Sequence, residues 1–317
     1  MTAPFDTLRL PVFAAPMFLV SGPEMVIAAC RSGIGGAFPT PNCRTVEDLD
    51  RWMGQITDAL KPGDAPWIAN MITHSTNTRL AEDLRLVAHY KPPVVITALG
   101  SPRPVIETVK SYGGLVFADV VSMKLARKAA EAGVDGLACV SAGAGGHTGH
   151  LSPFAFISAV RDFFDGYIAV GGGVGDGAGI AGAVAAGADF VYMGTRFLAT
   201  TESMAQPAYK QMVIDAGPDD LVVSDSVTGT PASWLKPSLR AAGQDPDNLV
   251  APAERSYVSG GDNKRWRDIW AAGQGLEAVR AVEPVAEVVA QLEREYVAAL
   301  DRFAAKTARR PALRGAA

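Results

Sequence analysis

The chain has 317 residues, of which 48% are hydrophobic and 20% charged, and its formal net charge is −4. This balance excludes a disordered chain, which would be poor in apolar residues, and gives no sign of a basic face for nucleic acid. Glycine and proline are in excess, at 33 and 21 residues. We expect much of the glycine to close turns and to let the backbone approach a ligand.

Eight short apolar runs, bounded by turn residues, recur through the first two thirds of the chain. Segments with apolar residues at helical spacing separate them, such as the stretch from Val46 to Leu60. Alternation of strands and helices favours one closed (β/α)8 barrel of parallel strands over a doubly wound open sheet. The expected strands are Val12–Ala15, Gly35–Phe38, Trp67–Met71, Val94–Ala98, Leu115–Val120, Gly136–Val140, Tyr167–Val170 and Phe190–Met193.

Two of the helix-to-strand joints are near copies of each other. In each, a glycine, Gly133 or Gly187, is placed to stop the helix in a left-handed conformation shortly before the next strand. Because this repeat has a structural explanation, we assign it no role in binding.

After the eighth strand the pattern changes. We expect a helix near 205–216, an irregular stretch rich in Gly, Pro and Ser over 217–261, and a final helix around 285–303. The whole of 1–317 is predicted to form a single barrel domain. Residues 217–265 would be a lid or extension, and the basic end, 306–317, a flexible tail.

Cysteine usage and hydropathy bound the environment. The three cysteines, Cys30, Cys43 and Cys139, lack metal-ligand spacing, and their odd number fits a reducing compartment. The N-terminus lacks the apolar stretch of a signal peptide, and no run reaches the length of a membrane span. We therefore expect a cytoplasmic protein that binds no metal, nucleic acid or membrane, and we leave self-association open.

The segment 141–150, which follows the sixth strand, is the richest in chemistry. It reads Ser-Ala-Gly-Ala-Gly-Gly-His-Thr-Gly-His. Glycines such as Gly145 and Gly146 let the backbone fold around a flat ligand, and His147 can exchange protons near neutral pH. The alternative is a glycine-rich turn whose histidine only satisfies a backbone group. Its place at a barrel strand end favours a functional histidine.

Two further glycine segments follow the seventh and eighth strands. Gly172 and Gly173 lie in the first, and Gly194 and Thr195 in the second, where barrels commonly bind phosphate through backbone N–H groups. The alternative is tight turns alone. The stretch 177–182 matches G-x-G-x-x-G, but it lies late in the chain without the expected acidic partner, so we interpret it as helix packing.

Other strand ends carry weaker signals. Pro16 and Met17 follow the first strand, and Asn70 lies in the third, where an amide could pair with an imide edge. His74 is interpreted as a loop residue. His74 and His150 are only candidates for residues that line the pocket. There is no G-x-S-x-G nucleophile elbow and no histidine spacing typical of metal sites.

Taken together, these segments resemble the nitronate monooxygenase family, formerly called 2-nitropropane dioxygenases. The likeness runs from about Pro11 to Tyr296, and the GGH-x-G and GTRF pair also occurs in the related flavin enoyl-acyl-carrier-protein reductases and NADH:quinone reductases. The matching segments are Ala15–Met17, Asn70, Ala144–Gly149, Val170–Gly173, Met193–Phe197 and Ala272–Gly275.

The resemblance implies a (β/α)8 barrel that binds FMN without covalent attachment. It implies that Gly172, Gly173, Gly194 and Thr195 hold the phosphate and that Pro16, Met17 and Asn70 lie near the isoalloxazine ring. It also implies that Gly145 and Gly146 border the flavin, that Gln274 closes over it, and that His147 is the catalytic base or orienting group.

Two departures from the family pattern affect the substrate. Gly143 stands where members commonly have an acidic residue before the histidine, and Asp119-Val120-Val121 stands where some relatives place a lysine. The fold and the FMN assignment survive both.

The leading hypothesis for the reaction is oxidation of an alkyl nitronate or nitroalkane with O2 to a carbonyl compound and nitrite. A second is reduction of a quinone or enoyl thioester with NAD(P)H. A third is a flavin- or phosphate-binding barrel without turnover.

Overall fold

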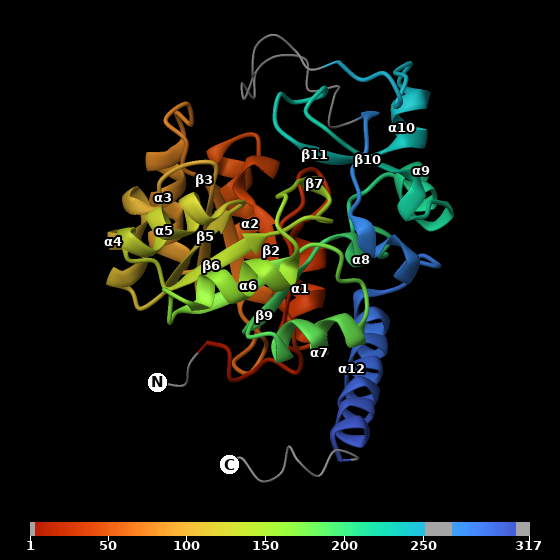
Figure 1. Cartoon of the computed structure of the whole chain (residues 1–317). Coiled ribbons are helices and arrows are strands. Elements are labelled where there is room, and N and C mark those ends of the chain that lie inside the picture. Colours follow the sequence, from red (N-terminus) through yellow and green to blue (C-terminus); the bar gives the residue numbers. More distant parts are fainter. Residues whose placement is uncertain (1–3, 251–267, 309–317) are drawn as a thin grey trace.

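The computed structural model describes residues 4–250 and 268–308. Eight parallel strands close into a barrel surrounded by helices (Figure 1). This confirms the predicted (β/α)8 barrel, and each predicted strand is present to within one residue at either end. The barrel strands, in order around it, are β1 (Val12–Ala14), β2 (Gly35–Pro39), β3 (Trp67–Ile72), β4 (Val94–Ala98), β5 (Leu115–Val120), β6 (Gly136–Val140), β8 (Tyr167–Gly171) and β9 (Phe190–Met193).

Alternate residues of each strand fill the barrel interior, because side chains of a strand point to opposite faces in turn. Phe13, Phe117 and Phe190 meet there with Phe5 from the N-terminal segment, whose ring centroid lies 4.5 Å from that of Phe190. The outward residues form a separate core beneath the helices. Aromatic packing thus closes the N-terminal end of the barrel, which leaves the carboxyl ends of the strands for a ligand.

The helices begin and end at local signals. The side chains of Ser122 and Asp176 accept hydrogen bonds from the backbone of the first turns that follow. Gly133 and Gly187 have φ of 88° and 106°, as predicted. The α-helices are α1 (Pro23–Arg31), α2 (Val46–Ala59), α3 (Leu80–Tyr90), α4 (Arg103–Ser111), α5 (Met123–Ala132), α6 (Pro153–Arg161), α7 (Gly177–Ala185), α8 (Thr195–Leu198), α9 (Pro207–Asp215), α10 (Lys236–Ala241) and α12 (Val285–Ala308), and short 3-10 turns are η1 (Thr40–Asn42), η2 (Pro218–Asp220) and η3 (Gln274–Ala278).

A second, antiparallel sheet lies beside the barrel, with strand order β10-β11-β7. Its strands are β7 (Gly146–His147), β10 (Leu221–Ser224) and β11 (Ala232–Leu235). The expectation of an irregular stretch over 217–261 is therefore wrong for β10, β11 and α10. Trp234 is fully buried and its indole N–H donates to the Ser224 carbonyl oxygen at 3.2 Å. Residues 251–261 lie outside the described part of the chain, and the role of 217–265 as a lid stays a prediction.

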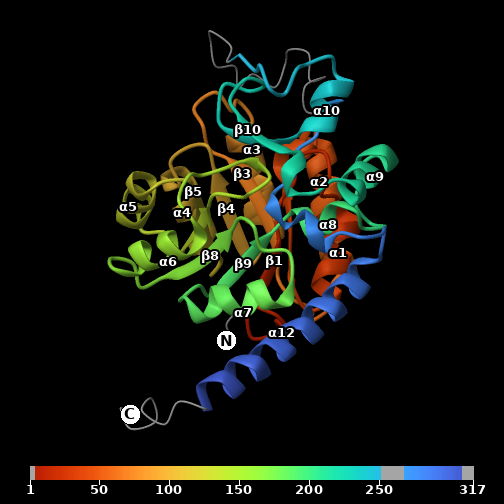
Figure 2. The ribbon, with the colours of Figure 1, turned by 45° about the vertical axis from the view of Figure 1, so that its right-hand side comes forward.

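The last helix, α12, is longer than expected. It continues to Ala308, so the predicted tail at 306–317 begins inside a helix, and its remainder lies outside the described residues. Figure 2 shows α12 running past α7 and extending beyond the barrel. A side chain at Gly177, the first residue of α7, would collide with the backbone of Leu292 in α12. Close packing of two helices thus explains the first glycine of the G-x-G-x-x-G segment.

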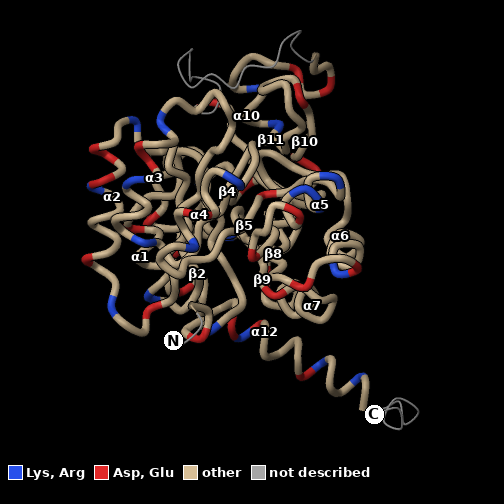
Figure 3. Tube along the Cα trace, turned by 90° about the vertical axis from the view of Figure 1, so that its left-hand side faces the viewer, with Lys and Arg blue, Asp and Glu red and all other residues tan. Residues whose placement is uncertain are grey.

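The described surface carries both signs of charge. In the view of Figure 3, acidic and basic residues alternate over the outer helices and loops. Among the described residues, no helix has the length and apolar composition needed to cross a membrane.

Candidate functional site

The predicted site residues come from five segments at the carboxyl ends of barrel strands and from the 272–275 segment. The loop after β6 and the loop after β8 meet directly, because the Gly173 N–H donates to the Gly143 carbonyl oxygen at 3.1 Å. The same oxygen accepts from the Gln274 N–H at 2.9 Å. The Thr195 hydroxyl accepts from the Gly273 N–H at 2.9 Å. These bonds bring three strand-end loops and the 272–275 segment into one assembly.

The glycines of this assembly have different tasks. An added Cβ at Gly145 would lie 2.7 Å from the Gly273 nitrogen, and one at Gly172 would lie 2.6 Å from the Ala142 carbonyl oxygen. Both positions therefore need glycine for contacts within the protein. At Gly173 the nearest atom to such a Cβ is the Gln274 Oε1 at 3.8 Å. Its backbone is thus open to a ligand.

Gly194 is similarly open on its outer side. Its nearest neighbour would be the Met17 sulfur, 3.5 Å from the added Cβ, which is ordinary van der Waals contact. Because α8 begins at Thr195 and has only four residues, a helix dipole contributes little here. Individual N–H groups and the Thr195 hydroxyl would have to bind a phosphate.

Met17 is held in place by a residue that the sequence did not indicate. The Asn42 amide donates to the carbonyl oxygens of Met17 (3.1 Å) and Ser21 (2.8 Å), and its oxygen accepts from the Leu19 N–H at 2.9 Å. Leu19 has a positive φ of 60°, which is uncommon for a branched side chain. Asn42 thus fixes the conformation of the loop that carries Pro16 and Met17.

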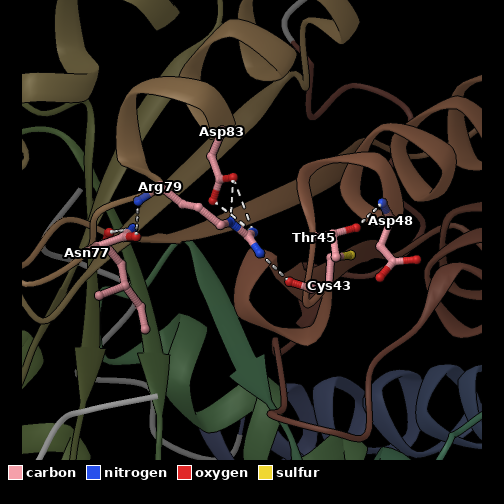
Figure 4. Close-up of polar contacts among 7 residues, drawn as sticks. Cys43, Thr45, Asp48, Asn77, Arg79 and Asp83 are labelled. Carbon is pink, nitrogen blue, oxygen red and sulfur yellow. Dashed lines mark hydrogen bonds and ion pairs between the residues drawn. The ribbon is translucent and has the colours of Figure 1, made fainter. Parts of the chain in front are cut away.

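The position of Asn42 is itself supported from α3. Arg79 donates to the carbonyl oxygen of Cys43, the next residue, at 2.6 Å and pairs with Asp83 at 3.1 Å (Figure 4). Burial raises the pKa of the Asp83 carboxyl group, and the bond to Arg79 opposes that shift. The hydrogen bond to Cys43 connects the loop after β2 to the start of α3, and the ion pair with Asp83 holds the Arg79 side chain in place.

His147 lies on β7, the edge strand of the small sheet. β7 pairs with β11, with His147 opposite Ala232 and Gly146 opposite Ser233. The buried Thr148 hydroxyl donates to the Ser141 carbonyl oxygen at 3.0 Å. Burial lowers the pKa of His147 below its usual 6.5. The imidazole is thus neutral at neutral pH and suited to accept a proton.

Asn70 has two partners that were not among the predicted site residues. Its amide donates to the Asp119 Oδ2 at 3.3 Å and to the Ile96 carbonyl oxygen at 3.4 Å. A side-chain hydrogen bond also joins Asp119 and Tyr192. The alternation along β5 and β9 could have indicated these two residues, because it turns both side chains into the barrel.

The remaining histidine candidates differ in their surroundings. His74 Nδ1 forms a hydrogen bond with the Thr76 hydroxyl at 2.8 Å, within a turn. His150 is exposed. In the described parts of the chain, no group of three or more His, Cys, Asp or Glu side chains is arranged to hold a metal ion.

Comparison with known proteins agrees with this architecture. The family model for nitronate monooxygenase matches residues 3–295. A curated nitronate monooxygenase from Paraburkholderia phytofirmans is 26% identical over 92% of this chain and 94% of its own length. A nitroalkane oxidase structure from Streptomyces ansochromogenes superimposes with a TM-score of 0.83 at 23% identity, covering 95% of this chain and 100% of that one.

Another relative differs in its printed activity. It is the (3aS,4S,5R,7aS)-5-hydroxy-7a-methyl-1-oxo-octahydro-1H-indene-4-carboxyl-CoA dehydrogenase of Mycobacterium tuberculosis, 30% identical over 72% of this chain. The match spans only 64% of that relative's length. Since the family model covers nearly the whole chain, the protein belongs to the nitronate monooxygenase family, which makes it an enzyme and implies a flavin cofactor.

Proposed function

We propose that the protein is an FMN-dependent oxidoreductase that converts alkyl nitronates or nitroalkanes, with O2, to a carbonyl compound and nitrite. The observation that carries this proposal is the position of His147, a half-buried histidine with a lowered pKa, on the strand that follows the loop bonded to Gly173. A nitroalkane must lose its α-proton before oxidation, and a neutral imidazole is a base of suitable strength.

The residues of the site fit a flavin mononucleotide. Gly173 and Gly194 leave backbone free of side chains at adjacent strand ends, and Thr195 retains its hydroxyl hydrogen for a phosphate oxygen while it accepts from Gly273. The Asn70 carbonyl oxygen, on the inner face of β3, can accept a hydrogen bond from the N–H of the imide edge of the ring. These groups come from the phosphate and ring positions that the family resemblance implies.

The flavin would supply the electron transfer, and the protein would bind and orient the reactants. His147 accepts the α-proton of a neutral nitroalkane, and as imidazolium it stabilises a bound nitronate anion. Gln274 is exposed and its side-chain oxygen lies over Gly143 and Gly173. It would cover the phosphate end of the site.

The test is direct. The purified protein should show a flavin absorption spectrum and release FMN on denaturation, and it should consume O2 and form nitrite with propionate 3-nitronate or 2-nitropropane. His147→Asn should lower kcat/KM for neutral 2-nitropropane by about 100-fold, the usual size of a general-base contribution. His150→Asn, which changes an exposed neighbour, is the matched control. Failure of the wild-type protein to form nitrite would exclude this function.

A second candidate function is oxidation or reduction of a thioester. The similarity to a carboxyl-CoA dehydrogenase favours it, and NAD(P)H would then serve as electron donor for a reductase acting on an enoyl thioester or quinone. Anaerobic addition of NADH or NADPH separates the two. Rapid bleaching of the flavin supports a reductase, whereas no bleaching together with nitrite formation supports the oxygenase.

A further inference from the structure

The last inward-facing residues of β5 and β9 differ from those beneath them. Phe117 on β5 and Phe190 on β9, each two residues deeper in the barrel, are buried. Asp119 and Tyr192, which lie nearer the carboxyl ends, are each only half-buried. These two side chains are therefore partly open toward the strand ends that carry the site.

Hydrogen bonds join these residues to Asn70. The Asn70 amide donates one hydrogen to Asp119 Oδ2 and the other to the Ile96 carbonyl oxygen. Both donor hydrogens are then in use, so the Asn70 carbonyl oxygen is the atom left for a ligand, and it can only accept. The orientation of the Asn70 amide thus depends on the carboxyl group of Asp119.

One oxygen of the Asp119 carboxyl group lacks a hydrogen-bond partner among the described residues. Asp119 Oδ1 is buried and forms no hydrogen bond to any described residue. Buried polar atoms are nearly always paired, so an atom from outside the chain is expected to complete this one. Asn70, which bonds to this carboxyl group, is the residue that the family resemblance puts near the flavin ring, so the ring is the candidate partner.

We propose that Asp119 is a positioning residue of the flavin site: it orients Asn70 through Oδ2 and presents Oδ1 to the bound ring. This inference rests on the proposed flavin-dependent function and adds a contact to it. A carboxyl group at this position has two states. When protonated it donates to a ring acceptor, and when ionised it places a negative charge next to the ring.

The Asp119 carboxyl group changes between its protonated and ionised forms near neutral pH. Burial raises the pKa of Asp119 to about 7, while the bonds from Asn70 and Tyr192 oppose the shift. The titratable groups that interact with Asp119 are Tyr192 on β9 and Cys139 on β6, and burial raises the pKa of Tyr192 well above 10 and that of Cys139 to about 12. Neither ionises in this range. β3 contributes Asn70 and β4 the carbonyl oxygen of Ile96, neither of which ionises.

The experiment measures the midpoint potential of the bound flavin from pH 5.5 to 8.5 in the flavin-loaded protein. A negative charge beside the ring disfavours reduction, so the potential of the wild type should fall below that of Asp119→Asn at pH 8.5. The two should coincide at pH 5.5, where both side chains are neutral. Tyr192→Phe removes one bond to the carboxylate, which raises the pKa of Asp119, and should move the divergence to higher pH.

Two controls isolate the effect. His147→Asn removes the titratable imidazole from the predicted site. When it is introduced into both the wild type and Asp119→Asn, the difference between their potentials should remain. Thr97→Val removes a buried hydroxyl that bonds only the Phe117 carbonyl oxygen of the barrel wall, and it should leave the potential unchanged. Equal potentials of wild type and Asp119→Asn at every pH, in a protein that binds flavin and forms nitrite, would overturn the role of Asp119 alone. A protein without flavin would overturn the proposed function instead.

Discussion

Gly194 provides the sharpest test of where the flavin phosphate lies. Its φ of −103° and ψ of −65° are accessible to alanine. The nearest atom to an added Cβ would be the Met17 sulfur at 3.5 Å, so the folded protein should accept Gly194→Ala with little loss of stability. Only a ligand that lies against this backbone would be displaced.

The expected loss follows from one contact. A phosphate oxygen moved away from the Gly194 N–H loses a charge-assisted hydrogen bond, worth about 1.5–3 kcal/mol. Because 1.4 kcal/mol corresponds to a factor of ten, the dissociation constant for FMN should rise roughly 10-fold to 100-fold. Titration of flavin-free protein with FMN, followed by fluorescence quenching, measures it, and urea unfolding of the same sample reports its stability.

The control is an alanine at a glycine remote from these loops. Gly182→Ala in α7 would meet only the Phe154 ring, at 3.9 Å, and should bind FMN as the wild type does. An unchanged FMN dissociation constant in Gly194→Ala, with the fold intact, would refute the assignment of Gly194 to the phosphate.

Three further outcomes are expected. Asn42→Ala removes three hydrogen bonds from the loop that carries Met17. Urea unfolding should show that the free energy of unfolding falls by about 1–3 kcal/mol, and FMN should bind more weakly. An unaltered FMN affinity would show that this loop does not contact the flavin. Arg79→Met leaves the buried Asp83 carboxyl group without its partner and should cost about 3–5 kcal/mol at neutral pH, with Asp83→Asn in the same chain restoring part of it. Because burial lowers the pKa of His147, its neutral, basic form persists below pH 6.5. In the pH profile, kcat/KM for a neutral nitroalkane should therefore fall only at more acid pH. A fall of kcat/KM centred above pH 6.5 would contradict the role of His147 as base.

The barrel could be predicted because its signals are local. A buried parallel strand is an apolar run of four to six residues, and each of the eight stands between turn residues or helical periodicity. Glycines that end helices, such as Gly133, can be recognised because they directly follow the last residue with helical spacing. Four of the strands, β1, β2, β3 and β8, differ from the prediction by a single residue at the carboxyl end, and the other four have the predicted bounds.

The small sheet could not be predicted in the same way. β7 has two residues, and its partner β11 lies more than eighty residues later in the chain. A pairing of that separation depends on how the loops after β6 and β9 are brought together, and no periodicity within Gly146–His147 reports it. The consequence is functional, since this pairing is what holds the backbone of His147.

The strand-end glycines have different roles that the sequence alone does not distinguish. The sequence places Gly145, Gly172, Gly173 and Gly194 alike at strand ends, and each looks like part of a ligand cradle. The structure separates them by what a Cβ would meet: protein backbone at Gly145 and Gly172, open space or a side chain at Gly173 and Gly194. The first pair is required for the 141–145 loop to pack closely against its neighbours, whether or not a ligand binds. A glycine-rich motif therefore predicts a tight assembly of loops, and the ligand contact is expected at the two positions where that assembly leaves the backbone uncovered.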